Sequence, residues 1–133
     1  MNYWIFIANQ NHWDWLEQKI GDVEPWNAKR TNGSIKPYFS EIQKGDKIIG
    51  YQAGKRSRYF VSLAEIERPL TIKDGKADIE IRKIMDFKKP ISLYEARKIP
   101  PFEELLKSHR LNTTALPITE DEYNKLRYLA DKT

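Results

Sequence analysis

The chain has 133 residues, with 23 Lys or Arg against 19 Asp or Glu, for a net charge of +4. This length suits one domain, residues 1–133, with a core that needs no metal or disulfide. Cysteine is absent, which excludes disulfide scaffolds and thiolate zinc sites and agrees with a reducing cytoplasm.

The start of the chain predicts a buried strand followed by a short helix. Residues 3–8 are rich in aromatic and β-branched residues, which is typical of a buried strand. This run is too short to span a bilayer and lacks the basic start of a signal peptide, so we expect a soluble, cytoplasmic protein. Trp13, Leu16 and Ile20 then recur at helical spacing after Asn11, a common capping residue.

The middle of the chain predicts antiparallel strands joined by turns. Residues 44–47 form a turn signal that leads into a strand over residues 48–52, and residues 59–67 predict a central strand. The Lys-Asp-Gly-Lys sequence at 73–76 is a hairpin signal, and apolar and charged residues alternate after it. A further short helix is predicted within residues 34–42.

The last third predicts helices. Ser92 with Glu95, and Thr119 with Glu122, have the spacing of capping boxes. The second box opens a helix with an apolar stripe on one side. The whole pattern predicts several strands that close on themselves, with short helices at the ends.

Catalytic and metal-binding motifs are missing. His12 and His109 are the only histidines, and they are far apart in the sequence. Residues 50–57 resemble a phosphate loop, but they are one residue short between the glycines and join two predicted strands. We therefore expect no metal, no cofactor and no enzymatic activity.

All four tryptophans lie within the first 26 residues. Trp4 falls inside an apolar strand and is expected in the core, whereas Trp13 suits a core or a pocket equally well. Trp26 lies among polar residues, just before Lys29 and Arg30, so a core role is less natural. Flat aromatic surfaces near positive charge suit a nucleobase on a phosphate backbone.

Two sets of residues follow as candidates for such a site. The base-pocket candidates, which combine stacking rings with amides that can read a base edge, are Asn9, Trp13, Trp26, Tyr51 and Gln52. The candidates for holding the phosphate backbone are Lys29, Arg30, Lys55, Arg56 and Arg58. A charge run is also commonly just a solvated surface, and Asn at a turn often binds only nearby backbone.

Motifs over nearly the whole chain resemble the EVE domain family. They are Asn2-Tyr3-Trp4-Ile5-Phe6, Trp26-x-x-Lys29-Arg30, Lys44-Gly45-Asp46-Lys47, Ala64-Glu65-Ile66, Lys89-Pro90-Ile91-Ser92-Leu93 and Leu116-Pro117-Ile118-Thr119. Each motif is weak alone, but together they follow the family order from Asn2 to Ala130. Residues 31–40 match the family pattern poorly.

The resemblance implies a fold and a partner. EVE domains are PUA-like and close in architecture to YTH domains, which cage a methylated adenine. The implied fold is α+β, a PUA-like mixed β-barrel of about five or six strands with short flanking helices. The implied function is a nucleic-acid-binding module with a pocket for a modified, flipped-out base.

The leading hypothesis is a reader of modified cytosine or adenine in DNA, and the alternative is a PUA-like module that reads modified RNA. EVE domains also act as reading modules of modification-dependent restriction systems, so fusion to or association with a nucleotide-driven nuclease complex is implied. The isolated domain is expected to be monomeric and away from membranes. An enzyme acting on a nucleotide and a protein-interaction domain without a cavity are the hypotheses of other classes.

Overall fold

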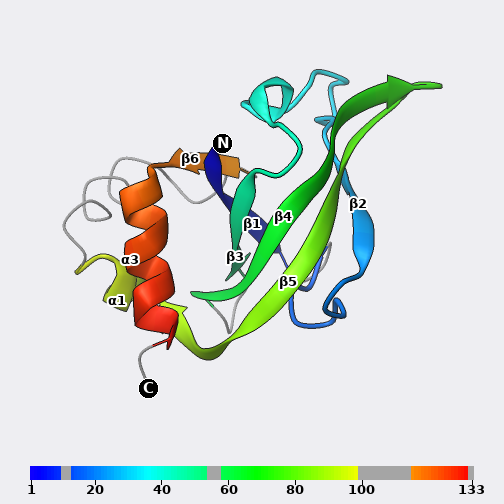
Figure 1. Cartoon of the computed structure of the whole chain (residues 1–133). Coiled ribbons are helices and arrows are strands. Elements are labelled where there is room, and N and C mark those ends of the chain that lie inside the picture. The colour runs from blue at the N-terminus through cyan, green and yellow to red at the C-terminus, as the bar shows by residue number, and fades with distance from the viewer. Residues whose placement is uncertain (10–12, 54–57, 99–114, 132–133) are drawn as a thin grey trace.

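The computed structural model describes residues 1–9, 13–53, 58–98 and 115–131. Within these ranges the chain forms six strands, two α-helices and one 3-10 helix (Figure 1). In chain order the elements are β1 (Tyr3–Asn9), β2 (Val23–Asn27), η1 (Phe39–Glu41), β3 (Lys47–Ala53), β4 (Arg58–Lys73), β5 (Lys76–Ser92), α1 (Leu93–Ala96), β6 (Ala115–Ile118) and α3 (Glu120–Asp131). Five residues discussed above lie outside the described ranges: Asn11, His12, Lys55, Arg56 and His109.

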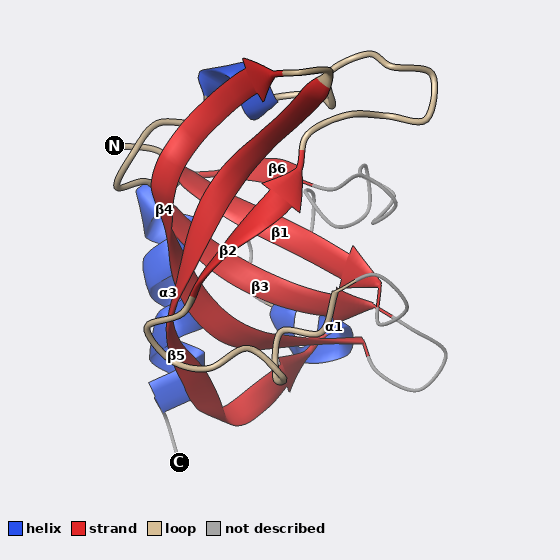
Figure 2. Cartoon of the chain, turned by 90° about the vertical axis from the view of Figure 1, so that its right-hand side faces the viewer, coloured by secondary structure: helices blue, strands red, loops and turns tan. Residues whose placement is uncertain are grey.

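The strands form one curved sheet in the order β2-β5-β4-β3-β1-β6 (Figure 2). β1 and β3 are parallel, and the other neighbouring strands are antiparallel. A mixed sheet with helices confirms the α+β class. In the described residues β2 and β6 are the two edges of the sheet and do not pair with each other, so closure into a barrel is not confirmed.

Both faces of the sheet are covered, as the apolar composition of the central strands requires. Alternation along β1 sends Phe6 to one face and Ile5 to the other, and both side chains are fully buried. The face of Ile5 packs against the helices through residues such as Leu126, and we call this side the helix-side core. The face of Phe6 holds the tryptophans and Phe39, and we call it the tryptophan-side core.

Local signals in the sequence are confirmed where they involve near neighbours. Ser92 and Glu95 form a complete capping box at α1, and Thr119 and Glu122 exchange the same pair of hydrogen bonds before α3. The 73–76 turn joins β4 to β5, and Gly75 has the positive φ of 76° that this turn requires. Within the described residues, no helix is long and apolar enough to cross a membrane.

Two helix predictions are wrong. Residues 13–21 form turns instead of a helix, and Leu16 and Ile20 are 55% and 66% exposed instead of facing the core. The segment over residues 34–42 contains only the single 3-10 turn of η1.

The strands β4 and β5 also run further than predicted, because they pair with each other well beyond the rest of the sheet.

Candidate nucleic-acid interface

Three tryptophans of the tryptophan-side core, two from the segment before β2 and one from β2 itself, meet in one aromatic cluster. The ring centroids of Trp13 and Trp26 are 4.9 Å apart, those of Trp15 and Trp26 are 5.7 Å apart, and those of Trp13 and Trp15 are 5.8 Å apart. Phe6 of β1 closes the cluster with an edge contact to Trp26 at 5.3 Å. These separations lie in the range where aromatic rings attract one another.

The three rings differ in their access to solvent. Trp15 is fully buried and Trp26 is 6% exposed, whereas Trp13 is only partly buried and packs against the outside of the core. The expectation that Trp26 lies outside the core is therefore wrong, because β2 turns its indole inward onto Phe6. A flat ligand would meet the cluster at Trp13, with Trp26 as the support behind it.

The segment that carries Trp13 and Trp15 is held by Gln52, a buried residue of β3. The Gln52 side-chain oxygen accepts a hydrogen bond from the Trp15 backbone N–H at 2.9 Å. Its side-chain nitrogen donates to the carbonyls of Ala8 and Trp13 at 3.2 and 3.1 Å. The amide proposed to read a base edge is thus bonded to the protein's own backbone, which gives it a positioning role in the free protein.

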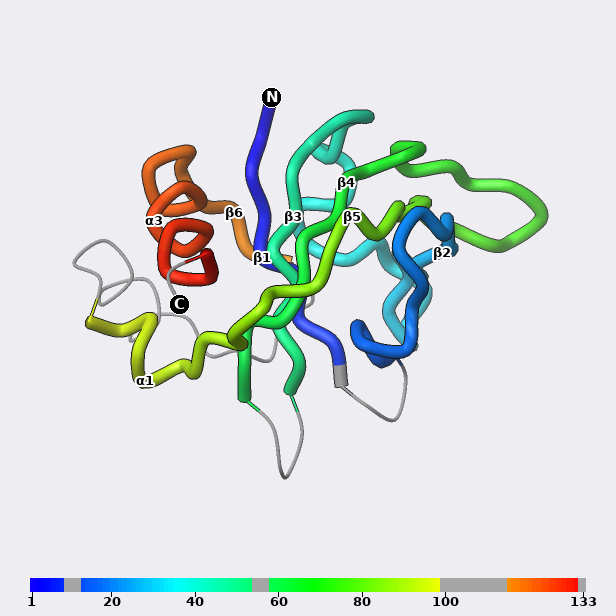
Figure 3. Tube along the Cα trace, turned by 60° about the horizontal axis from the view of Figure 1, so that its bottom comes forward, coloured from blue at the N-terminus to red at the C-terminus, as the bar shows by residue number. Residues whose placement is uncertain are grey.

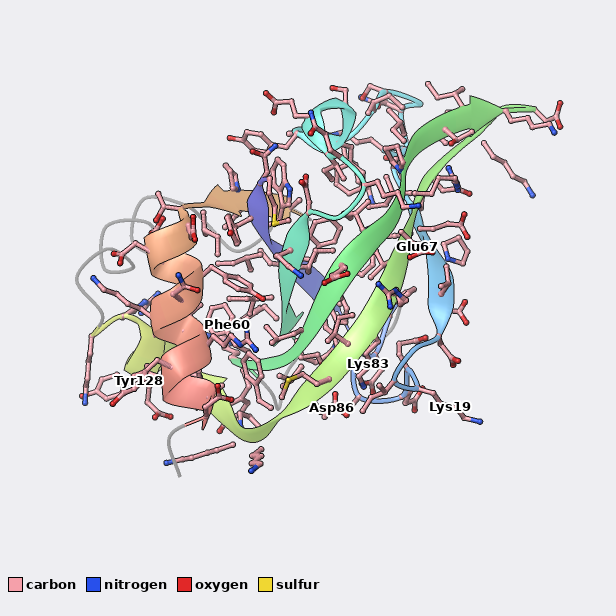
Figure 4. The ribbon with its side chains drawn as sticks, in the orientation of Figure 1. Lys19, Phe60, Glu67, Lys83, Asp86 and Tyr128 are labelled. Atoms are coloured by element: carbon pink, nitrogen blue, oxygen red, sulfur yellow. The ribbon has the colours of Figure 1, made fainter. Side chains whose placement is uncertain are left out.

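Lys83 of β5 holds the same segment from the other side and was missed by sequence reasoning. Its ammonium donates to the carbonyls of Trp15 and Gln18 at 2.8 and 2.7 Å and pairs with Asp86 at 2.6 Å. Figure 4 labels Lys83 and Asp86 near each other along the lower part of β5. Together with the hydrogen bonds of Gln52, these bonds tie the segment to the sheet, and residues 13–21 form turns.

A sequence signal for Lys83 did exist. Alternate residues of β5 from Ala77 onward face the tryptophan-side core, and Ile79 and Ile81 fill the next two such positions. Lys83 occupies the position that follows and is 3% exposed. A lysine at a core position of a strand requires acceptors, since burying an unpaired ammonium is very costly.

Tyr51 does not join the aromatic cluster. Neighbouring residues of a strand point to opposite faces, so Tyr51 enters the helix-side core while Gln52 faces the tryptophans. Tyr51 is 1% exposed and makes an edge contact with Phe60, with ring centroids 4.8 Å apart. Burial raises the pKa of the Tyr51 phenol, and Arg58 opposes this shift. The structure therefore separates Tyr51 from the other pocket candidates.

Asn9 lies at the end of β1, in register with Ala53 of β3. Its backbone thus lies close to Gln52, at the end of the paired strands β1 and β3. The structure describes the backbone of Asn9 and not its side chain, so its role as a base reader stays a prediction.

Two buried donors of the aromatic cluster are unsatisfied within the described residues. The indole N–H groups of Trp13 and Trp15 have no hydrogen-bond partner there. Such a buried donor typically costs about 1–3 kcal/mol, and unsatisfied groups of this kind call for an explanation such as a functional role. The cluster therefore contains two hydrogen-bond donors that no described residue accepts.

The basic candidates lie on two sides of the aromatic cluster. Lys29 reaches the β4–β5 turn, where its ammonium donates to the carbonyl of Gly75 at 2.6 Å, and Arg30 beside it is exposed. Arg58 begins β4 at the other end, in register with Ala53. The 16 residues of β4 separate these groups by about 50 Å along the strand, so they do not form one patch.

One further cation lies near Lys29. Lys36 donates to the carbonyl of Asn27 at 2.8 Å, and burial lowers the pKa of its ammonium. Among the described residues, no three His, Asp or Glu side chains gather in a way that would hold a metal ion. The chemistry supported by these side chains is stacking and hydrogen bonding.

An open surface cleft of about 470 Å³ lies away from the aromatic cluster, at the start of β1 and the end of β6. Its wall includes Trp4, whose indole N–H donates to buried Asp46 at 3.0 Å, and Tyr38, whose backbone has a positive φ of 70°. Two carboxylates, Glu41 and Glu120, also line it. Their negative charge makes it an unsuitable place for a phosphate backbone.

Known structures share this fold. Protein Atu2648 from Agrobacterium tumefaciens has a TM-score of 0.79 and 23% identity over 98% of this chain and 94% of its own. Human THYN1 in complex with 5-methylcytosine containing DNA has a TM-score of 0.80 and 12% identity, covering 100% of this chain and 99% of its own. The YTH domain of Zygosaccharomyces rouxii MRB1, in complex with N6-methyladenosine RNA, has a TM-score of 0.59 and 13% identity over 98% and 88%.

The curated proteins offer no match to this chain. The model of the EVE domain family, however, matches residues 2–129, which is nearly the full length. This match agrees with the order of the motifs in the sequence and with the mixed sheet in the structure. The chain belongs to the EVE domain family.

Proposed function

We propose that this chain is a nucleic-acid-binding module that recognises a modified base by stacking it on Trp13. The observation that carries the proposal is the aromatic cluster, in which the one partly exposed indole, Trp13, is backed by the buried rings of Trp15 and Trp26. A base that leaves its helix loses stacking, which an aromatic ring restores by about 1–3 kcal/mol.

The surroundings of Trp13 suit this role. Gln52 and Lys83 fix the backbone of its segment from two strands, so the ring is held in place before a ligand arrives. A held ring lowers the ordering cost of binding.

We favour DNA over RNA as the partner. The similar THYN1 structure contains 5-methylcytosine DNA and has a TM-score of 0.80, against 0.59 for the YTH domain with N6-methyladenosine RNA. Modified cytosine is therefore the first candidate, followed by modified adenine. The YTH likeness supports the second candidate function, a reader of modified RNA.

The family resemblance further supports a role as the reading module of a restriction or defence system in the cytoplasm. In that role the domain is not itself an enzyme, and it works beside or fused to a nucleotide-driven nuclease. We expect the isolated domain to be monomeric. Incubation with a modified oligonucleotide should yield a complex and no altered product; a product would instead support the enzyme hypothesis.

The decisive experiment is a binding panel of short DNA and RNA oligonucleotides, each with a single modified base, at fixed salt. Trp13→Ala should weaken binding to the preferred modified oligonucleotide by about 1–3 kcal/mol, and Trp13→Phe should retain part of it. Tyr128→Ala is the matched control, because Tyr128 is a 67% exposed aromatic residue of α3 on the helix side (Figure 4).

Two results would count against the proposal. One is wild-type protein that binds every modified oligonucleotide no better than its unmodified counterpart. The other is a folded Trp13→Ala variant with wild-type preference, which would place the base elsewhere.

A further inference from the structure

The longest strands of the sheet extend beyond it as a two-stranded arm. The last pair between β3 and β4 is Lys47 with Glu65, and the last pair between β2 and β5 is Asn27 with Asp78. β4 and β5 nevertheless stay paired to Lys73 with Lys76. We call residues 71–76 the β4–β5 arm. All six of its residues are exposed, and Figures 1 and 3 show it projecting from the body of the protein.

The arm has a defined turn at its tip and ion pairs at its base. Its two turn residues, Asp74 and Gly75, both have positive φ, the geometry that matches the twist of the flanking strands. At its base Arg68 of β4 forms ion pairs with Asp78 and Glu80 of β5. These ion pairs join the two strands at the base of the arm, and the turn sets their pairing at its tip.

Positive charge is concentrated at the tip of the arm, where it destabilises the folded hairpin. Lys73 and Lys76 lie directly opposite each other, and like charges in this arrangement destabilise a hairpin. The Lys29 ammonium adds a third positive charge at the carbonyl of Gly75, against the single carboxylate of Asp74. An anionic partner would relieve this repulsion.

The arm also presents one apolar side chain on the aromatic side. Ile72 is 64% exposed and pairs with Ala77, which belongs to the tryptophan-side core. Trp26 is in register with Ile79 of β5, three residues from Lys76, so the tip lies about 10 Å along the strand from the cluster. That distance corresponds to about three base pairs of DNA, at 3.4 Å per base pair.

We propose that the β4–β5 arm enters the major groove of double-stranded DNA beside the base that the cluster holds. The inference rests on the proposed function and names its substrate as a duplex. A two-stranded ribbon fits the major groove of B-DNA, whereas the major groove of A-form RNA is too narrow and deep for side chains to read. Lys73 and Lys76 bind phosphates at the groove edge, and Ile72 contacts the bases.

The test compares the full chain with a Lys73→Gln/Lys76→Gln variant on duplex and single-stranded DNA, each with and without the modified base. Loss of two phosphate contacts should weaken duplex binding roughly 10- to 30-fold at 0.15 M salt and make the slope of log affinity against log salt shallower by about 1.8. The ratio of modified to unmodified affinity should not change. Binding to single strands should change much less.

Lys88→Gln/Lys89→Gln is the matched control, because both lysines are exposed near the far end of β5. An unchanged duplex affinity and salt slope would overturn the arm proposal, as would equal losses in the control variant or on single strands. Ile72→Ala should weaken duplex binding without changing the salt slope. A variant with wild-type duplex affinity would show that Ile72 does not contact the bases. A wild-type protein without preference for modified bases would instead refute the proposed function. The affinity and salt slope of the Lys73→Gln/Lys76→Gln variant on unmodified duplex would still test the arm.

Discussion

Gly50 of β3 gives the sharpest test of how the tryptophans are placed. A methyl group at Gly50 would lie 2.6 Å from both Cδ2 and Cε2 of the Trp15 indole. Carbon atoms in ordinary contact are about 3.5–4.0 Å apart, so Gly50→Ala creates an overlap of roughly 1 Å. Trp15 cannot easily move, because Gln52 holds its N–H at 2.9 Å and Lys83 holds its carbonyl at 2.8 Å.

The expected cost is that of an overpacked core, about 1–3 kcal/mol. For 133 residues the entropy of unfolding is about 0.28 kcal/mol/K, so the melting temperature should fall by about 4–11 °C. Thermal and denaturant unfolding would measure this change. Because Trp13 packs on Trp15, the preference for modified over unmodified oligonucleotide should fall as well.

A second variant separates the clash from other effects of Gly50→Ala. In a Trp15→Leu background the indole is gone, so the same substitution at Gly50 should cost much less than in the wild type. A Gly50→Ala protein that melts within 1 °C of the wild type, or equal costs in the two backgrounds, would refute this account of the packing.

Further predictions follow from other buried groups. Trp26→Ala should lower the free energy of unfolding by about 3–5 kcal/mol in denaturant titrations, the usual cost of removing a buried aromatic ring; a loss below 1 kcal/mol would contradict its place in the core. Lys83→Met should cost about 2–4 kcal/mol, since the buried carbonyl of Trp15 and the partly buried carbonyl of Gln18 lose a charged donor, whereas exposed Lys88→Met should stay within about 0.5 kcal/mol of the wild type. The folded-state pKa of Tyr51 is raised above its ordinary value of 10.0, so its contribution to stability is complete below pH 10 and is lost as the pH rises through the folded pKa. Unfolding at pH 8 and pH 11 should therefore show a smaller alkaline loss for Tyr51→Phe than for the wild type, and identical losses would exclude this residue as a cause. Asn9→Ala should reduce the ratio of modified to unmodified binding more than non-specific binding, and equal losses on both oligonucleotides would make Asn9 part of the scaffold.

The sequence alone was sufficient to predict features whose interacting residues are close together along the chain. The capping boxes at Ser92 and Thr119 form because each cap and its partner are three residues apart. The hairpin at residues 73–76 forms because its turn residues favour positive φ. The opposite directions of Tyr51 and Gln52 also follow from strand alternation, although the candidate pocket did not take this into account.

Only the tertiary structure decided how the aromatic cluster is assembled and held. Trp26 is buried because β2 pairs with β5, a partner more than fifty residues further along the chain. The Trp13–Trp15 segment forms turns because Gln52 and Lys83 take up its backbone groups, and Lys83 lies 68 residues from Trp15. A helical pattern of apolar residues cannot reveal such competition, since the free energy of these distant hydrogen bonds exists only once the sheet has formed.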